Sequence, residues 1–552
     1  MPRKVNAELP ARQLSRRRLF AGSAAVALTA AGPGLGTASA APEESGELTA
    51  RSTFGPITVT PSDPQYGDLV RRQLNQRFIG QPEMVKVVGA THQVQGVVQA
   101  AVDAGKRITV ISGGHCLEGF PFEPSVKVVL DVSELDNVYY DSKYNAVAVE
   151  AGTTLLDVYE QLYQTWGVTV PGGICHSVGM GGHVVGGGWG MLCRRFGLIV
   201  DHLYGVEVVV VGADGRASTV VATREASDPN RELWWAHTGG GGGNFGVVTR
   251  YLFRSPGMTT YDPAKILPRP PQKVLLSEIG IPWATLTRDG LANLLKNYGA
   301  WHVANSSPSS PAAALHAEIT LNHQSKGFLG LMTQVDAAVP NAQAILDDYL
   351  KTVLNGVGPW GGGTRTLPWL QATKYIGKAI ISFNDPTLRA DYKSAYMKAT
   401  FTDAQAGTFY DFLTAPGMDT TAISVGLSSY GGAVNAVPSD ATAHCHRDSA
   451  FQLLWITHWS NPADDAKFRG WLRDFYTKVF ANTGGVPTPN AQTDGCYVNY
   501  PDTDLGDPTW NRSATPWHDL YYKGNYPRLQ RAKKAWDPKN IFNHEQSIRL
   551  PY

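Results

Sequence analysis

The sequence has no excess of charge of either sign, few charged residues and no long apolar run. Its 552 residues include 48 basic and 47 acidic side chains, and charged residues make up only 17%. A net charge of +1 provides no basic face for a phosphate backbone, so nucleic acid is not an expected partner. No segment after the N-terminal region reaches the ~18 continuous apolar residues of a membrane helix, so we expect no membrane partner.

Cysteine is also scarce, and its number is odd. An odd count leaves at least one thiol without an intramolecular partner, which in an exported protein needs an explanation. A metal site is also unsupported. His444 and His446 are close in sequence but lack an evident third ligand, so we predict no metal site and assign them to a surface loop. The cysteines are Cys116, Cys175, Cys193, Cys445 and Cys496.

The first 40 residues have the pattern of an export signal. Arg16, Arg17 and Arg18 precede an apolar run over residues 21–31, and residues 38–40 form a small-residue cleavage pattern. The run is too short to span a bilayer of roughly 30 Å. Twin arginines before a modest apolar region are typical of the Tat pathway, with a Sec signal as the alternative. We therefore expect residues 1–40 to be a Tat-type signal peptide and the protein to be secreted.

Beyond residue 80, short β-branched runs alternate with helical segments. The apolar spacing of residues 91–105 predicts a helix that ends at Gly105, and residues 153–167 predict another, capped by Thr153 or Thr154. After a proline-rich stretch at residues 255–271, extended runs alternate with helical stretches such as 332–350, which favours an antiparallel sheet covered by helices. The expected strands include residues 84–90, 105–112, 126–133, 146–152, 204–215, 245–254, 313–323 and 449–459.

Three clusters of residues carry candidate chemistry. The first is Ser112-Gly113-Gly114-His115, directly after an expected strand. Paired glycines there let backbone N–H groups approach an anion closely, as in a phosphate cradle. His115 is then a candidate ligand, base or attachment point, and an ordinary turn histidine is the alternative.

The second cluster runs from Pro171 to Gly190 and is dense in glycine. It predicts neither a regular helix nor a strand, because each glycine weakens both. Interleaved Cys, His, Val and Trp distinguish it from a flexible linker. A dinucleotide fingerprint fits poorly, because no helix of suitable length separates the glycines from Asp201. We interpret the segment as backbone that wraps a ligand.

The third cluster, residues 494–505, holds two candidate acid–base groups, Tyr497 and Tyr500. An unperturbed phenol has a pKa of about 10, so either residue needs help from its surroundings to act as a base near neutral pH. Aromatic packing with a satisfied hydroxyl group is the alternative for each of them.

In order and spacing, the three clusters resemble the berberine bridge enzyme-like branch of the vanillyl-alcohol oxidase flavoprotein superfamily, most closely its bicovalent bacterial members. The resemblance implies FAD as cofactor and an α+β fold. A two-lobed, PCMH-type FAD-binding domain would span residues 41–255, with its core at about 80–255. A substrate-binding domain with an antiparallel sheet covered by helices would span 256–490, and a C-terminal segment, 491–552, would return to the FAD domain.

The resemblance also assigns cofactor roles. His115 matches a histidine bonded to the flavin 8α-methyl group, and Cys175 matches a cysteine bonded to flavin C6, which would explain a thiol without a partner. Val178 matches a gatekeeper position beside the flavin, where a small residue leaves room for O2. The other residues expected to bind FAD are Ser112, Gly113, Gly114, Gly179, Gly181, Gly182, His183, Gly246, Val248 and Asn499.

The implied catalytic residues come with departures from the family pattern. Tyr497 matches the catalytic base of bacterial sugar and antibiotic oxidases, and Tyr500 lies beside it in sequence. Trp189 stands where antibiotic-sugar oxidases often carry Tyr, which argues against a two-tyrosine, two-step oxidation. Where plant alkaloid enzymes carry a Glu base, Tyr430 is the candidate here, which favours alcohol oxidation over ring closure. Ile111 stands where most members have Arg.

Together these features predict a secreted FAD oxidase that converts a hydroxyl group of a bulky natural product, or of its sugar, to a carbonyl. Tyr497 would take the alcohol proton while hydride moves to flavin N5, and O2 would reoxidise the flavin to give hydrogen peroxide. An oligosaccharide oxidase that forms a lactone is the alternative within this chemistry. A drug-binding resistance protein that uses flavin as a scaffold is the alternative of another class. The presence of Cys175, Val178 and Tyr497 argues against it, because binding alone needs none of them.

Overall fold

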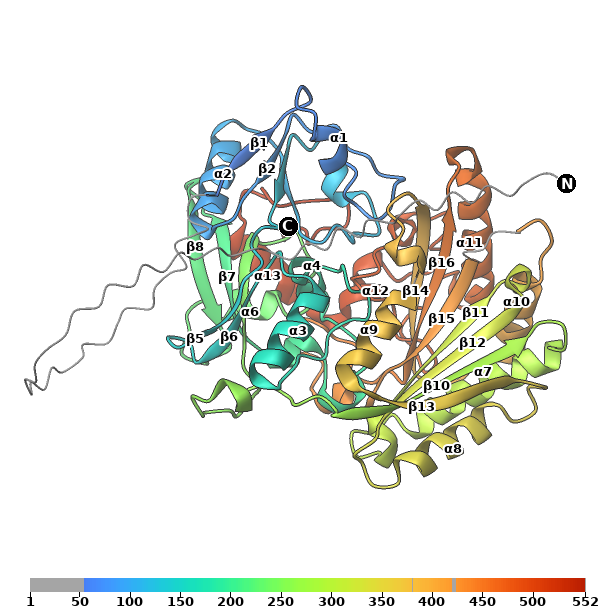
Figure 1. The fold of residues 1–552 in the computed structure, drawn as a ribbon. Helices are drawn as coiled ribbons and strands as arrows, with labels where there is room; N and C mark the ends of the chain where they lie inside the picture. Colours follow the sequence, from blue (N-terminus) through green and yellow to red (C-terminus); the bar gives the residue numbers. More distant parts are fainter. Residues whose placement is uncertain (1–53, 380, 419–422, 552) are drawn as a thin grey trace, which may run out of the picture. The chain divides into compact units, whose positions relative to one another are not determined.

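The β-branched runs of the N-terminal half fold into two sheets (Figure 1). The computed structural model describes residues 54–379, 381–418 and 423–551, so the predicted signal peptide lies outside the described residues. The first sheet has the order β1-β2-β4-β3 and the second β5-β6-β9-β7-β8. These strands are β1 (Ile57–Val59), β2 (Met84–Val87), β3 (Ile108–Ile111), β4 (Val128–Asp131), β5 (Val138–Asp141), β6 (Ala146–Glu150), β7 (Leu203–Val211), β8 (Ala217–Thr223) and β9 (Val247–Phe253).

Two helices of this half have a terminus where capping chemistry predicts it. Helix α2 (Thr91–Asp103) is followed by Gly105 at φ 61°, and Thr154 caps α3 (Leu155–Trp166) by accepting a hydrogen bond from the Asp157 N–H. The other helices here are α1 (Tyr66–Leu69), α4 (Met180–His183), α5 (Cys193–Phe196) and α6 (Arg231–Ala236).

The middle third forms a single antiparallel sheet with the order β13-β10-β12-β11-β15-β16-β14. Helices α7 (Arg288–Ala304), α8 (Ala342–Val353), α10 (Asp403–Leu413) and α11 (Asp465–Val479) cover one face of it (Figure 1). This arrangement confirms the predicted α+β fold. The strands are β10 (Lys273–Pro282), β11 (Leu315–Asn322), β12 (Phe328–Asp336), β13 (Gly361–Pro368), β14 (Arg389–Met397), β15 (Ile423–Ser429) and β16 (Phe451–Trp459).

Two local predictions were wrong. Residues 332–350 are not one helix, because Met332–Asp336 completes β12 and α8 begins only at Ala342, after Asn341 at φ 60°. Residues 332–336 are a strand rather than a helix because β12 pairs with β10 on one side and with β11 on the other. The glycine-rich segment is also not wholly irregular, because Met180–His183 forms one helical turn, α4.

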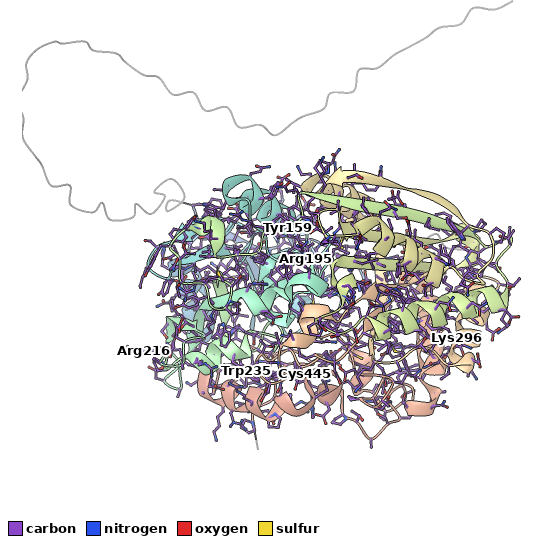
Figure 2. The ribbon with its side chains drawn as sticks, turned by 90° about the horizontal axis from the view of Figure 1, so that it is seen from below. Tyr159, Arg195, Arg216, Trp235, Lys296 and Cys445 are labelled. Atoms are coloured by element: carbon purple, nitrogen blue, oxygen red, sulfur yellow. The ribbon has the colours of Figure 1, made fainter. Side chains whose placement is uncertain are left out.

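The last 60 residues pack against the N-terminal half. They contain α12 (Trp517–Tyr522) and α13 (Tyr526–Trp536), and the Arg528 guanidinium of α13 lies 3.9 Å above the Trp235 ring of α6 (Figure 2 labels Trp235). The same guanidinium binds both carboxylate oxygens of Glu232 at 2.8 and 2.6 Å. Helix α9 (Trp369–Ala379) contacts α3. The domain boundaries themselves stay predictions.

In the parts of the chain that the structure describes, no helix is both long enough and apolar enough to cross a membrane.

Glu118 makes the stability of this fold depend on pH. Its buried carboxyl group accepts hydrogen bonds from the Thr503 N–H and Oγ at 3.1 and 3.3 Å. Burial, together with the charges of Asp391 and Asp502, raises its pKa from 4.5 to about 8. The unfolded chain therefore releases this proton above pH 4.5 while the folded chain retains it, so stability falls as pH rises towards 8.

We expect Glu118→Gln to remove this loss, because an amide mimics the protonated carboxyl group. Relative to the variant, the unmodified protein should lose on the order of 3 kcal/mol of stability between pH 5 and 8. Melting temperatures at the two pH values check this. Glu134→Gln, at an exposed site, is the matched control. Parallel pH profiles for Glu118→Gln and the unmodified protein would contradict the prediction.

Candidate active site

A cavity of about 1360 Å³ is enclosed by the two glycine-rich loops, the C-terminal segment and the open face of the seven-stranded sheet. Pockets for drug-sized ligands measure roughly 300–1,000 Å³, so this cavity has room for a cofactor together with a substrate. It collects all the residues predicted to bind the cofactor, although their roles stay predictions. These residues are Ser112, Gly113, Gly114, His115, Cys175, Val178, Gly179, Gly181, Gly182, His183, Gly246, Val248 and Asn499.

The two glycine-rich loops touch backbone to backbone. A Cβ atom on Gly113 would lie 2.2 Å from the Gly179 nitrogen, and one on Gly179 would lie 2.2 Å from Ser112 Oγ. Such distances are impossible for any side chain, so only glycine permits this approach. Ser112 Oγ donates to the Ala151 carbonyl at 2.6 Å, and Arg72 donates to the Ser112 carbonyl. The loops thus form a fixed wall of backbone groups.

His115 is a neutral imidazole with one nitrogen already bonded. Its Nε2 lies 2.8 Å from Ser177 Oγ, which leaves Nδ1 without a hydrogen bond among the described residues. Burial lowers the pKa of His115 from 6.5 to about 4. At neutral pH the side chain therefore carries a lone pair suited to forming a covalent bond rather than a positive charge.

Cys175 lines the same cavity as a free thiol. Burial raises its pKa to about 12, and the negative charge of Glu318 adds to the effect. No disulfide forms at any of the five cysteines, all of which the structure describes. The thiol therefore remains available to a group bound in the cavity.

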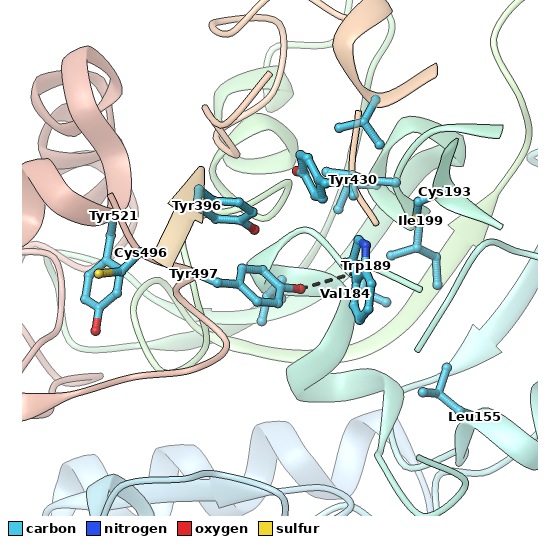
Figure 3. Packing of buried hydrophobic residues seen from close by; sticks show 14 of the residues in the cluster. Leu155, Val184, Trp189, Cys193, Ile199, Tyr396, Tyr430, Cys496, Tyr497 and Tyr521 are labelled. Atoms are coloured by element: carbon cyan, nitrogen blue, oxygen red, sulfur yellow. Dashed lines mark hydrogen bonds between the residues drawn. The ribbon is translucent and has the colours of Figure 1, made fainter. Parts of the chain in front are cut away.

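Tyr497 has a hydroxyl group surrounded by hydrogen-bond donors. Its Oη accepts from Asn499 Nδ2 at 2.9 Å, from the Gly188 N–H at 3.1 Å and from the Trp189 N–H at 3.3 Å. Figure 3 shows the hydroxyl group directed at Trp189. Burial raises the pKa of Tyr497, and these three hydrogen bonds lower it. Three donors exceed the two lone pairs of a neutral phenol, so these hydrogen bonds favour the ionised oxygen, although burial has the larger effect and disfavours it.

The other predicted catalytic residues divide into two groups. Trp189 and Tyr500 line the cavity, and the Tyr500 ring packs edge-on against Tyr497 with 4.9 Å between centroids. Tyr430 is not part of the cavity wall. It is fully buried, its hydroxyl group lies 2.8 Å from His444 Nε2, and its ring lies beside that of Tyr396 (Figure 3).

The sequence predicted a surface loop for His444 and His446, and this prediction was wrong. Both are buried, because His444 packs against Gly187 and His446 contacts Asp494 at 3.3 Å. Within the described ranges, no three His, Cys, Asp or Glu side chains gather as a metal ion would require.

Sequence reasoning missed the sheet's contribution to the cavity. Glu318, Thr320 and Asn322 of β11 line it, and Ser428 of β15 and Gln452 of β16 do so as well. A signal was present in the run LHAEITLN, where His, Glu, Thr and Asn alternate with apolar residues. The sequence did not show which face of the strand would meet the cofactor site.

Comparison with known proteins identifies the family. A model described as FAD binding domain matches residues 82–220, and one described as berberine and berberine like matches residues 496–549. The chain is 46% identical to aclacinomycin-N/aclacinomycin-A oxidase of Streptomyces galilaeus over 97% of this chain and 98% of that protein. This chain belongs to the berberine bridge enzyme-like FAD-linked oxidases.

Two further relatives of this berberine bridge enzyme-like protein extend the comparison. Hexose oxidase of Chondrus crispus is 32% identical over 88% of this chain and 93% of its own length. The crystal structure of glycopeptide hexose oxidase DBV29 complexed with teicoplanin matches with a TM-score of 0.85 and 44% identity, covering 90% of this chain and 99% of that one. The protein is thus an FAD-dependent oxidoreductase.

The residues present fit FAD. The glycine loops offer backbone N–H groups at a close approach that a Cβ atom would block, which suits a pyrophosphate. His115 Nδ1 and Cys175 Sγ place two atoms that can form covalent bonds in the same cavity. At Gly246, a Cβ atom would lie 2.5 Å from the Val209 carbonyl oxygen, so the cavity wall there also requires glycine.

Proposed function

We propose that the protein is an exported oxidase that carries FAD covalently and converts a hydroxyl group of a sugar-bearing natural product to a carbonyl. The observation that carries the proposal is the position of Tyr497, whose oxygen accepts three N–H donors in the cavity that also holds His115 and Cys175. The names of its relatives, which include an aclacinomycin oxidase and two hexose oxidases, support this substrate class.

Bound FAD would supply a two-electron acceptor that O2 reoxidises, so that alcohol and O2 give a carbonyl compound and hydrogen peroxide. Tyr497 Oη would accept the proton of the substrate hydroxyl group. Asn499 fixes that oxygen, because its Nδ2 also donates to the His183 carbonyl at 2.9 Å. Tyr500 packs against the Tyr497 ring and limits its motion.

Attachment through His115 Nδ1 and Cys175 Sγ would fix the cofactor without help from a closing lid. The cavity can then stay open to a bulky substrate. Val178, a small side chain in the wall, would leave space for O2 beside the cofactor. For residues 1–40 we propose export by the Tat route, which carries folded proteins and so permits the cofactor to be loaded before transport.

Peroxide release tests the proposed function. The holoenzyme should release hydrogen peroxide with glycosylated polyketides, together with a product two hydrogen atoms lighter than the substrate. If free hexoses or oligosaccharides are oxidised better, the protein is instead a carbohydrate oxidase. The 32% identity to a hexose oxidase supports that alternative. A holoenzyme that binds these compounds but releases no peroxide would instead support a drug-binding protein.

A further inference from the structure

Three strands far apart in the sequence place a row of polar side chains on the cavity floor. Glu318 of β11 lies directly opposite Ser428 of β15, which lies directly opposite Gln452 of β16. Residues opposite one another in a sheet point to the same face, and all three line the cavity. Carboxylate, hydroxyl and amide groups therefore stand side by side across about 10 Å of sheet.

No lysine or arginine in the described part of the chain forms an ion pair with the Glu318 carboxylate. Among the described residues its polar contacts are Ser428 Oγ at 3.3 Å and His316 Nε2 at 3.5 Å. Its side chain is 22% exposed, and that exposure faces the cavity. Burial raises the pKa of Cys175 and of Tyr500, and the negative charge of Glu318 adds to the rise in both. The carboxylate therefore acts on the part of the cavity where chemistry is proposed.

Gln452 is buried without partners. It is only 3% exposed, and neither Oε1 nor Nε2 has a hydrogen-bond partner within the described part of the chain. A buried amide without partners is costly to stability, and such groups are rare unless a ligand satisfies them. This amide lines the cavity, so a bound molecule can reach it.

The adjacent row of the sheet leaves space for that molecule. Gly330 and Gly426 lie on either side of Thr320, and all three line the cavity. A Cβ atom on Gly330 would meet its nearest neighbour only at 4.0 Å, and one on Gly426 only at 3.8 Å. These glycines therefore do not serve close packing of protein atoms, and they keep the floor flat beside the polar row.

We propose that Glu318, Ser428 and Gln452 form a substrate subsite that binds neighbouring hydroxyl groups of an uncharged sugar, or of an amino sugar, and disfavours acidic sugars. A carboxylate accepts hydrogen bonds from two hydroxyl groups, and an amide both donates and accepts, which matches the donor and acceptor of each sugar hydroxyl. An uncompensated negative charge attracts an ammonium group and repels a carboxylate. The inference rests on the proposed function and names its substrate class.

Apparent Kd values test the charge, and they are taken from the dependence of the flavin reduction rate of the holoenzyme on sugar concentration under anaerobic conditions. The probes are D-glucose, D-glucosamine and D-glucuronate. Glu318→Gln keeps the shape and removes the charge, so the preference for glucosamine over glucuronate, as a ratio of Kd values, should fall about tenfold or more. Glu278→Gln is the matched control, because Glu278 occupies the same cross-strand row but is bound by Arg365 and Tyr375.

A second variant tests the amide. Gln452→Leu removes a buried polar group without partners, so the melting temperature should rise, whereas the Kd for glucose should increase about tenfold. A residue with only a structural role would not increase stability and weaken glucose binding when it is replaced.

The outcomes separate this inference from the proposed function. An unchanged Kd ratio in Glu318→Gln, in an enzyme that still oxidises sugars, would overturn the subsite and leave the oxidase intact. If none of the three sugars binds to the unmodified holoenzyme, the subsite is also wrong. Peroxide release from non-sugar alcohols then decides the oxidase proposal by itself.

Discussion

Replacement of Tyr497 by phenylalanine should lower kcat/KM by about 10²–10⁴-fold, the usual contribution of a positioned general base. The variant should retain FAD, because the ring still packs against Tyr500 and only the hydroxyl group is lost. Peroxide release at saturating O2 measures the effect. Tyr349→Phe is the matched control, since its buried hydroxyl group has no hydrogen-bond partner among the described residues and does not line the cavity.

The pH profile should identify Tyr497 as the group that accepts the proton. Burial raises its pKa, and the Asn499 hydrogen bond opposes that rise. Activity should therefore increase with pH on the alkaline side as the phenol ionises. Asn499→Leu removes the donor, raises the pKa further and should move this limb to higher pH. If Tyr497→Phe retains activity within tenfold of the unmodified enzyme, another base is at work, and Tyr500 is the next candidate.

Removal of both proposed attachment residues should abolish covalent FAD, whereas removal of either one should not. The His115→Ala and Cys175→Ala variants should each keep flavin on the chain after acid precipitation, because the other residue still holds it. The double variant should release all of its flavin. Intact mass and the flavin fluorescence of the denatured protein measure this, and the unmodified chain should exceed the mass of its own polypeptide by about one FAD, whereas the double variant should not.

Two controls make the attachment test specific. Cys116→Ala alters the other thiol in the cavity wall and should leave the flavin attached. Ser177→Ala removes the hydrogen bond to His115 Nε2 and tests whether that contact orients the imidazole. Release of flavin from the unmodified protein by acid would show that neither bond forms, and a non-covalent flavoprotein would then be the better description.

Sequence motifs located the cofactor side of this site because each lies in one short stretch of chain. Where an added Cβ atom would lie only 2.2 Å from a neighbouring atom, as at Gly113 and Gly179, the chain requires glycine, and glycine is visible in a sequence. Likewise, Thr154 begins α3 and Gly105 follows the end of α2 where capping chemistry predicts. Such features depend on local geometry, so local sequence reveals them.

The substrate side depended on tertiary structure. Residues 328–336 became a strand because β10 and β11 pair with it, and His444 became buried because a glycine loop packs against it. No motif joins Glu318 to Gln452, which are 134 residues apart in sequence and come together only through the register of β11, β15 and β16.

The sequence by itself thus determined the family, the cofactor and the residues whose chemistry requires a particular backbone. Only the tertiary structure decided that Tyr430 lies outside the cavity and that three N–H groups converge on Tyr497. It also placed in the cavity floor a carboxylate that has no lysine or arginine partner among the described residues. The physical reason is that charge, burial and strand register arise from contacts between distant segments. A linear motif does not contain those contacts.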